Sequence, residues 1–290
     1  MHPEHPGRLK AVLAALDVPE FAALDRREAP LAQRAQIARV HSRLYVDRVL
    51  QAVPESGYVA LDPDTIISPG SGEAALRAAG ALVAAVDAVV AGEVRNAFCA
   101  VRPPGHHAEA VRPMGFCMFN NIAVGAEQAR KVHGLARVAV VDFDVHHGNG
   151  TQHMFDKDAD LFYASTHQWP HYPGTGASEE TGVGNIVNVP LAPMSGSREF
   201  RAAMSEIVLP ALVRFRPDMV MISAGFDAHA DDPLASLRLR ESDFEWATRQ
   251  LMAAADDCCG GRVVSTLEGG YDLEALAASA AAHVRTLMNG

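Results

Sequence analysis

The chain has 290 residues, of which 49% are hydrophobic and 21% charged, so it can build a packed core and is not a disordered or low-complexity chain. Its formal net charge of −10 argues against binding to nucleic acids or anionic membranes, which requires a basic surface. Histidine is abundant, with 13 residues against 4 cysteines, which directs attention to a metal or acid–base site.

The cysteine pattern and the first residues favour a cytoplasmic protein. No Cys-x-x-Cys pair occurs, which argues against a disulfide scaffold or a cysteine-based zinc module and fits a reducing compartment. The N-terminal residues contain no apolar signal-peptide core, and the apolar stretch 74–91 is interrupted by Arg77 and Asp87. We therefore expect neither secretion nor a membrane span. The preference for Arg over Lys, together with the abundant Ala, indicates a bacterial source.

From about residue 71, helical and strand patterns alternate along the chain. A Pro-Gly-Ser start is expected to supply the N-cap of the first helix in this series. Continuous apolar strands between helices indicate an α/β fold with one mostly parallel sheet, covered on both faces. In chain order we expect a helix at 71–91, a strand at 96–101, a helix at 121–132, a strand at 137–143, a short helix at 151–155, strands at 161–166 and 185–189, a helix at 197–215, a strand at 217–223, a helix at 241–258, a strand at 262–267 and a helix at 272–288.

The chain contains no internal repeat and no low-complexity linker. The segment richest in turn residues, 52–69, is too short to separate two domains, so we expect one domain over residues 1–290.

Polar motifs follow five of the expected strands. Since ligands of open α/β sheets bind at the carboxyl ends of the strands, these motifs should meet at one edge of the sheet. The motifs lie at residues 102–107, 142–147, 165–167, 224–227 and 268–271.

The segment Asp142-Phe-Asp-Val-His-His contains two candidate metal ligands, Asp144 and His146. Positions two apart on an extended strand face the same side, so both side chains can address one ion. Carboxylate oxygen and imidazole nitrogen suit zinc, and also Fe(II), Co(II) or Mn(II). Asp227, which ends an apolar strand after a permissive glycine, is the best candidate for a third ligand. The simpler alternative is a polar strand end with helix-capping aspartates.

The tandem histidines His106 and His107 lie on a Pro-Gly loop, where each ring needs a partner to fix its tautomer. Asp142 is a natural partner for one and Asn149 for the other. A His–Asp pair favours the imidazolium, whereas a His–Asn pair leaves the ring easier to deprotonate, so the two rings can divide acid and base roles. Tyr271 follows two glycines and could donate a hydrogen bond to a developing oxyanion, although a turn with a core tyrosine is the simpler interpretation of that motif alone.

Together the motifs resemble the histone deacetylase family, including its bacterial deacetylase-like amidohydrolases and the acetylpolyamine amidohydrolases. The resemblance runs from the His-Pro-Glu-His-Pro-Gly-Arg segment at residues 2–8 to Glu-Gly-Gly-Tyr at residues 268–271. It implies the arginase–deacetylase fold, a mostly parallel sheet of about eight strands between helices. Family members usually carry a first strand before the His-Pro-Glu-x-Pro motif, whereas this sequence begins inside that motif, so we expect either that the strand is missing or that the start site is misassigned.

The resemblance also implies roles for individual residues, each carried over onto the matching position of this sequence. The zinc ligands would be Asp144, His146 and Asp227, and the catalytic residues His106, His107, Asp142 and Tyr271. The tunnel walls would be Gly115, Phe116 and Tyr172, with Leu234 at the rim, Asn149 behind the tandem histidines and Arg8 near an internal exit for acetate. A potassium site would involve Asp142, Asp144, His146, Ser165 and Thr166, and a second one the backbone near Phe155, Asp158 and Leu161.

The implied activity is zinc-dependent hydrolysis of an acetyl amide, with an N-acetyl-lysine side chain as the expected substrate because Leu234 makes the rim apolar. His107 would act as the base, with Tyr271 and zinc stabilising the oxyanion. Three alternatives stay open: an acetylpolyamine or other small-amide hydrolase, a binuclear arginase-like ureohydrolase and a non-catalytic acyl-lysine binder. The resemblance leaves the oligomeric state open, homo-oligomers included.

Overall fold

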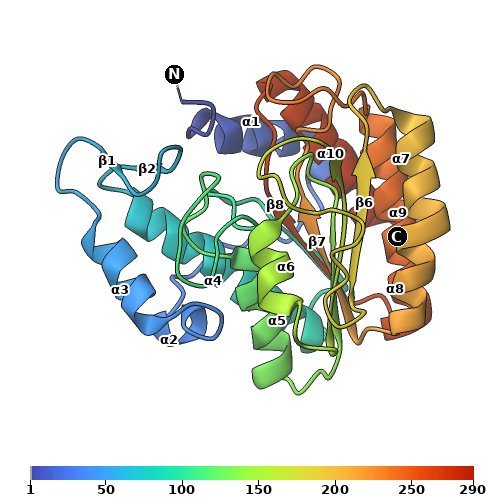
Figure 1. Ribbon diagram of the computed structural model, residues 1–290, viewed down its shortest axis with the longest axis horizontal. Coiled ribbons are helices and arrows are strands. Elements are labelled where there is room, and N and C mark those ends of the chain that lie inside the picture. The colour runs from blue at the N-terminus through green and yellow to red at the C-terminus, as the bar shows by residue number, and fades with distance from the viewer. Residues whose placement is uncertain (1) are drawn as a thin grey trace.

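The computed structural model describes residues 2–290. Its centre is a parallel sheet (Figure 1). The six strands of this sheet follow the order β3-β8-β7-β4-β5-β6. The strands β4, β5, β7 and β8 are buried at every residue, which explains their continuous apolar runs. All six strands expected from the sequence are confirmed. They are β3 (Asn96–Cys99), β4 (Val138–Asp142), β5 (Leu161–Gln168), β6 (Ile186–Leu191), β7 (Met219–Ala224) and β8 (Val263–Leu267).

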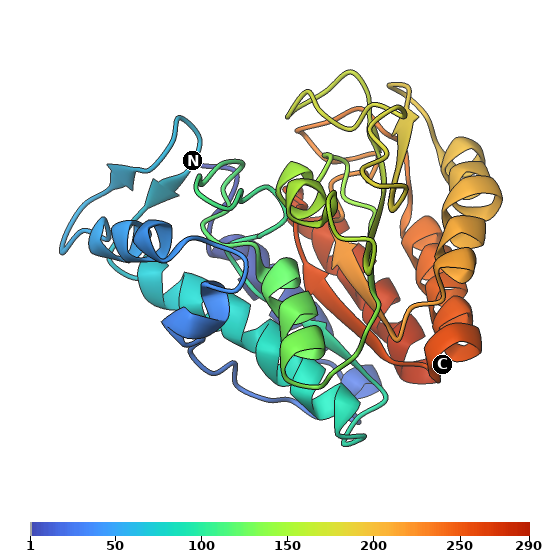
Figure 2. The same ribbon diagram turned by 60° about the horizontal axis from the view of Figure 1, so that its bottom comes forward.

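The main sheet therefore has six strands, against the approximately eight strands that the resemblance implied. Two further strands, β1 (Val59–Ala60) and β2 (Ile66–Ile67), form a separate antiparallel pair. This pair lies at one side of the molecule, away from the sheet, in both views (Figures 1 and 2). Within residues 2–290, β3 pairs only with β8 and forms one edge of the sheet.

Helices cover both faces of the sheet (Figures 1 and 2). One face packs against α4 and α5 through a core that includes Leu82 and Ile122, and the other packs against α8, α9 and α10 through a core that includes Leu212 and Phe244. The helices expected from residue 71 onward are confirmed, with the differences described below. The helices of this region are α4 (Ser71–Val90), α5 (Asn121–Lys131), α6 (Asn149–Phe155), α7 (Ser197–Ala203), α8 (Leu209–Phe215), α9 (Glu241–Cys259) and α10 (Leu273–Asn289).

Two details of these helices differ from the expectation. The N-cap of α4 is Gly70, which has no side chain to cap the helix. Ser71 is already the first helical residue, and its hydroxyl accepts the N–H of Ser68. The helix expected at 197–215 contains a π-helical turn, Met204–Val208, between α7 and α8. Pro210 is the second residue after this turn, and since proline has no N–H to donate to the preceding turn, it favours such a local widening.

The region before residue 71 contains elements that the sequence did not predict. Helix α1 buries Val12 and Leu16 and packs against α10. Further along, Ile37 and Tyr45 pack with Phe119 in a separate small core, to which α4 and α5 also contribute residues. The helical elements of this region are α1 (Gly7–Leu16), a 3-10 turn (Pro19–Phe21), α2 (Arg34–Ile37) and α3 (Arg43–Gln51).

The order of the strands fixes where a ligand can bind. From β4 the chain continues outward through β5 and β6, and then returns to the other side of β4 to form β7 and β8. The strand order therefore reverses between β4 and β7, and in open α/β sheets the crevice outside the carboxyl ends of such a strand pair is the usual binding site.

Candidate metal centre and active site

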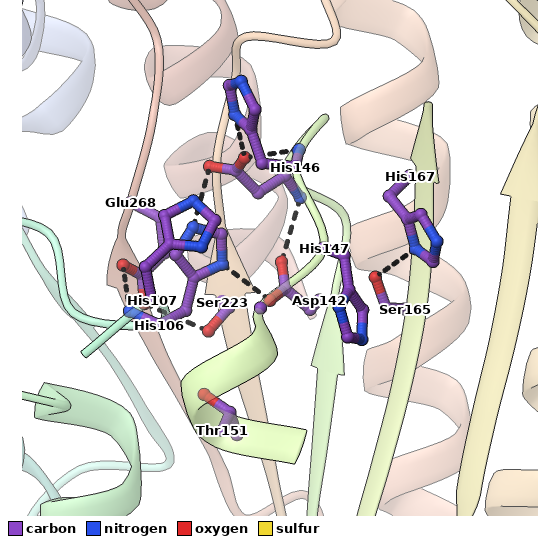
Figure 3. A network of polar contacts seen from close by, with 12 residues as sticks. His106, His107, Asp142, His146, His147, Thr151, Ser165, His167, Ser223 and Glu268 are labelled. Carbon is purple, nitrogen blue, oxygen red and sulfur yellow. Dashed lines mark hydrogen bonds and ion pairs between the residues drawn. The ribbon is translucent and has the colours of Figure 1, made fainter. Parts of the chain in front are cut away.

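The residues singled out from the sequence gather at this point of reversal. Asp144 and His146 follow β4, and Asp227 follows its neighbour β7. Segment 268–271 follows β8, and segment 102–107 follows β3. Four neighbouring strands thus bring their carboxyl-end motifs into one buried cluster, part of which is drawn in Figure 3.

Asp144, His146 and Asp227 form a compact three-residue group. The Nδ1 atom of His146 lies 3.1 Å from Asp144 Oδ1 and 3.1 Å from Asp227 Oδ2. One potential ligand atom from each residue lies within 4.8 Å of the other two, and all three residues are buried. Within residues 2–290 no other group of His, Cys, Asp or Glu side chains meets this description of a metal site.

Two glycines make room for the carboxylates. A Cβ atom on Gly225 would come within 2.0 Å of Asp144 Oδ2, and one on Gly269 within 2.0 Å of Asp227 Oδ2. Glycine is therefore required both in the Ser-Ala-Gly-Phe-Asp motif and in the Glu-Gly-Gly-Tyr motif. The backbone also supplies donors, because the N–H of Gly269 donates to Asp144 Oδ2 and the N–H of Val145 donates to Asp227 Oδ1.

The chemistry of this group fits a divalent metal ion. Burial and the neighbouring charge of Asp144 raise the pKa of Asp227, so the protein places two carboxylates where a positive charge is needed to keep both ionised. Two carboxylates and one imidazole are a donor set that zinc accepts, and three protein ligands leave coordination positions free. The residues present therefore fit a catalytic zinc ion.

The tandem histidines have the two partners expected from the sequence. Nδ1 of His106 lies 2.8 Å from Asp142 Oδ2, and Nδ1 of His107 lies 2.8 Å from Asn149 Oδ1. The amide nitrogen of Asn149 donates to Glu109 Oε1, which fixes Oδ1 as the atom that faces His107. Since this oxygen only accepts, the proton of a neutral His107 lies on Nδ1, and its Nε2 keeps a free lone pair.

The two imidazoles therefore have opposite protonation preferences. Burial alone would lower the pKa of His106, but the negative charges of Asp142, Asp144 and Glu268 outweigh it and hold that pKa well above the ordinary value. Burial, together with the positive charge of His106, holds the pKa of His107 well below the ordinary value. His106 therefore favours its charged form, and His107 favours its neutral form.

Sequence reasoning gave no role to Glu268, which links three strand ends (Figure 3). Its Oε2 accepts the N–H groups of Gly105 and His106, at 2.7 and 3.2 Å, and its Oε1 accepts the hydroxyl of Ser223. Burial raises the pKa of Glu268 to about 7. The available signal in the sequence was a glutamate directly after an apolar strand, but neither its burial nor its partners could be read from the sequence.

Tyr271 and Arg8 lie together at the end of the β8 motif. The guanidinium of Arg8 lies 4.8 Å from the centre of the Tyr271 ring and donates to the main-chain oxygens of Gly270 and Glu268. Arg8 is fully buried and also lies 3.5 Å from Glu4. Burial raises the pKa of the Tyr271 phenol well above its ordinary value, so the hydroxyl keeps its proton and can donate it in a hydrogen bond.

The residues expected to line a tunnel border the same cluster. Gly115 and Phe116 both have positive φ, 56° and 67°, and a Cβ on Gly115 would come within 2.3 Å of the His107 ring. The Phe116 ring lies 5.8 Å from that of Tyr271, and the Tyr172 ring lies 5.2 Å from that of His107. Leu234 is half-buried on the loop that follows β7.

Three further residues of this region were not assigned a role from the sequence. The ring of His171 stacks on that of the candidate ligand His146 at a centroid distance of 5.0 Å. Asp64, between β1 and β2, accepts the N–H of Gly115 at 3.0 Å. Asp232 accepts the N–H of Tyr271 at 2.7 Å, and so anchors the tyrosine loop. All three contact residues that are distant in the sequence, so their contacts are visible only in the folded protein.

The residues expected to bind potassium lie on the two adjacent strands β4 and β5 and the loop after β4. Asp142 pairs with Ser165 in the register of these strands. The Oγ atom of Ser165 lies 2.9 Å from His167 Nδ1, whereas the buried Oγ1 of Thr166 has no hydrogen-bond partner among residues 2–290. A buried hydroxyl oxygen with a free lone pair is compatible with a cation ligand.

The expected second potassium site is wrong in one respect. The main-chain oxygens of Phe155, Asp158 and Leu161 do converge, but the side-chain amide of Asn185 donates to all three. The position between these carbonyls is therefore taken by the chain itself.

Comparisons with known proteins agree with this geometry. The family model described as the histone deacetylase domain matches residues 2–287. A histone deacetylase-like amidohydrolase of Pseudomonas aeruginosa is 44% identical over 276 residues, which cover 93% of this chain and 72% of that protein. The chloroplastic histone deacetylase 14 of Arabidopsis thaliana is 40% identical over 313 residues, which cover 99% of this chain and 73% of that protein.

The similarity extends to three-dimensional structure. A crystal structure of the HDA15 HD domain matches with a TM-score of 0.94 and 38% sequence identity, covering 99% of this chain and 82% of that one. In residues 2–290, no helix has both the length and the apolar character that a membrane crossing needs.

Proposed function

Because this chain belongs to the histone deacetylase family and is a hydrolase of the deacetylase and amidohydrolase type, we propose that it hydrolyses an N-acetyl-lysine side chain. The observation that carries the proposal is the convergence of three features at one strand reversal. These are the group Asp144, His146 and Asp227, the oppositely tuned pair His106 and His107, and the half-buried Tyr271 with its protonated phenol.

Zinc is the proposed metal, and Asp144, His146 and Asp227 would hold it. When bound, zinc polarises an acyl carbonyl and makes a water molecule more acidic. We also propose a potassium ion at Asp142, Asp144, His146, Ser165 and Thr166, supported by the unpartnered hydroxyl of Thr166.

His107 would act as the general base. Its proton lies on Nδ1 towards Asn149, so Nε2 can accept a proton from the attacking water and later pass it to the nitrogen of the leaving amine. His106 would stay charged through its contact with Asp142 and act mainly by electrostatic stabilisation. The pair would thus separate proton transfer from charge stabilisation.

Tyr271 would stabilise the oxyanion that develops on the acyl oxygen. Its phenol remains protonated, and Arg8 and Asp232 hold its loop through main-chain contacts. A donor fixed before the reaction needs little reorganisation in the transition state.

The residues expected at the walls and the rim of the substrate tunnel support an acyl-lysine side chain as the group that enters the tunnel. Phe116 and Tyr172 supply aromatic surface beside His107 and Tyr271, which suits the apolar stem of an acyl-lysine. Leu234 offers no charge to select a polyamine. The net charge of −10 suits a lysine-rich peptide, but it suits an acetylated polyamine as well.

A substrate panel on zinc-loaded protein tests this proposal. We expect the highest kcat/KM for acetyl-lysine peptides, lower values for acetylspermidine and simple anilides, and loss of turnover when zinc is removed. A higher kcat/KM for acetylspermidine would make the protein an acetylpolyamine amidohydrolase. Bound zinc without turnover on any of these amides would support a non-catalytic acyl-lysine binder.

The remaining proposals concern the domain organisation, location and partners of this chain. We propose a single catalytic domain over residues 1–290 that works in the cytoplasm, without a nucleic-acid or membrane partner. Size-exclusion chromatography with light scattering would decide between a monomer and a homo-oligomer.

A further inference from the structure

Three main-chain carbonyl oxygens converge on a single side-chain nitrogen between α6 and β6. The Nδ2 atom of Asn185 lies 2.8 Å from the oxygen of Phe155, 3.0 Å from that of Asp158 and 2.5 Å from that of Leu161. Asn185 is only 4% exposed. The carbonyls therefore form a small cage around the buried amide nitrogen.

The turn between α6 and β5 creates this cage. The N–H of Asp158 donates to the oxygen of Phe155, and the N–H of Leu161 donates to the oxygen of Asp158, each at 3.0 Å. These bonds curl the chain so that oxygens spaced three residues apart face one point. Each carbonyl oxygen has two lone pairs, so it can accept its turn bond and still face the cage.

Converging carbonyl oxygens are the chemistry by which proteins replace the hydration shell of a potassium ion. A primary amide has only two hydrogens, so it cannot give each of three oxygens a full hydrogen bond. A cation would serve all three equally. The cage thus has the shape of a monovalent-cation site, but it holds part of a side chain.

We propose that the Asn185 amide replaces a monovalent cation in this cage, so that the chain binds no ion between Phe155, Asp158 and Leu161. The other end of the amide fixes its orientation, because Oδ1 of Asn185 accepts the N–H of Val183 at 3.1 Å. A flipped amide would direct Oδ1 at three carbonyl oxygens and lose that donor.

The cage contrasts with the proposed potassium site beside the metal centre. There, the buried hydroxyl oxygen of Thr166 has no hydrogen-bond partner in residues 2–290. At the cage, the amide nitrogen of Asn185 lies within 3.0 Å of every converging oxygen and takes the place of an ion. One site leaves an oxygen free for an ion, and the other does not.

The replacement ties together two segments that reach the active site. Helix α6 starts with Asn149, the partner of His107, and ends with Phe155, the first residue of the cage. Asn185 itself ends the long connection from β5 to β6 that carries Tyr172. The amide therefore holds both segments in place without depending on the concentration of potassium.

Thallium(I), which scatters anomalously and substitutes for potassium, tests the occupancy directly in crystals of the zinc-loaded wild-type protein. We expect no anomalous peak between the three carbonyls. In Asn185→Ala, which removes the amide, we expect one additional peak at that position. A peak at the cage in the wild-type protein would overturn the proposal, and this readout requires neither activity nor a variant that folds.

Thermal unfolding at constant ionic strength, with KCl exchanged for tetramethylammonium chloride, provides a solution test. Asn185→Ala and Asn185→Asp should have lower Tm values without potassium and recover more of their Tm with KCl than the wild-type protein does. Asn188→Ala is the matched control, because Asn188 is a buried asparagine on β6 that bonds to Gln152 and Glu180. It should lose stability without gaining a response to potassium. A potassium response of both Asn185 variants no larger than that of the wild type would also overturn the proposal.

Discussion

The rings of His106 and His107 lie 4.1 Å apart between centroids, yet each is held by a different kind of partner. His106 donates to the carboxylate of Asp142, whereas His107 donates to the amide oxygen of Asn149. If both partners were carboxylates, the second imidazole would also be stabilised as a cation. The neutral partner of His107 therefore preserves its capacity to accept a proton.

Replacing Asn149 with Asp should raise the pKa of His107. An opposite charge at hydrogen-bond distance favours the imidazolium and typically shifts a pKa by about 1–3 units. The base must be deprotonated to act, so the acidic limb of the kcat/KM profile should move to higher pH, with activity falling first on the acidic side. A pH series of kcat/KM on a single substrate measures the shift.

The neighbouring carboxylate of Glu109 requires a control for this experiment. Asn149 donates to Glu109, so in Asn149→Asp the introduced carboxylate would face that of Glu109 and could disturb the local fold. The double variant Asn149→Asp with Glu109→Gln restores a donor at that position, and Glu109→Gln alone provides the reference. An unchanged acidic limb in the folded double variant would remove His107 from the role of base.

Replacing Tyr271 with Phe should leave substrate binding nearly intact and lower kcat. Loss of one preorganised oxyanion donor typically costs about 10²–10³ in rate. Steady-state kinetics on the acetyl-lysine peptide separates kcat from KM. Tyr58→Phe makes the same chemical change at a side chain that is 80% exposed, and should behave as the wild-type protein does. Equal turnover of Tyr271→Phe and wild type would refute the role of the phenol.

The sheet and the metal ligands were predictable because both depend on local patterns. Continuous apolar runs identified all six strands of the main sheet, and the spacing of Asp144 and His146 placed them on one side of an extended segment. Asp227 was predictable because the carboxyl ends of parallel strands meet at one edge. These predictions did not require knowing which loops contact one another in the folded chain.

What could not be predicted depends on contacts between distant segments. Glu268 acts through Gly105 and Ser223, which lie on two other strand ends. Asn185 gave no signal in the sequence, because the carbonyls that it meets belong to the backbone of another segment. The helices before residue 71 were missed because they are short and owe their burial to tertiary packing, which outweighs weak local periodicity.

Replacing Asp227 with Asn should abolish high-affinity zinc binding. The change removes one of two anionic ligands and leaves an amide that binds zinc weakly. Elemental analysis after dialysis against zinc buffer measures occupancy. Asp257→Asn, which changes an exposed carboxylate far from the group, should retain full occupancy. Full zinc occupancy in Asp227→Asn would exclude Asp227 as a ligand.

The raised pKa of Glu268 should make the stability of the protein depend on pH. Burial raises its pKa from 4.5 to about 7, so between these values the folded chain holds a proton that the unfolded chain has lost. The folded state therefore binds more protons than the unfolded state, and the free energy of unfolding falls as pH rises through this window. Relative to low pH, this one group would cost about 3 kcal/mol once the pH passes 7.

Replacing Glu268 with Gln should remove this pH-dependent loss. The amide oxygen can still accept the N–H groups of Gly105 and His106, and the amide nitrogen can donate to the Ser223 hydroxyl. Urea unfolding of zinc-saturated protein from pH 5 to pH 8 should give a smaller loss of stability in Glu268→Gln than in the wild type. The exposed Glu206→Gln is the matched control and should follow the wild-type curve. Parallel curves for all three proteins would mean that Glu268 is already ionised at pH 5 in the folded chain, and that its contacts with the backbone outweigh its burial.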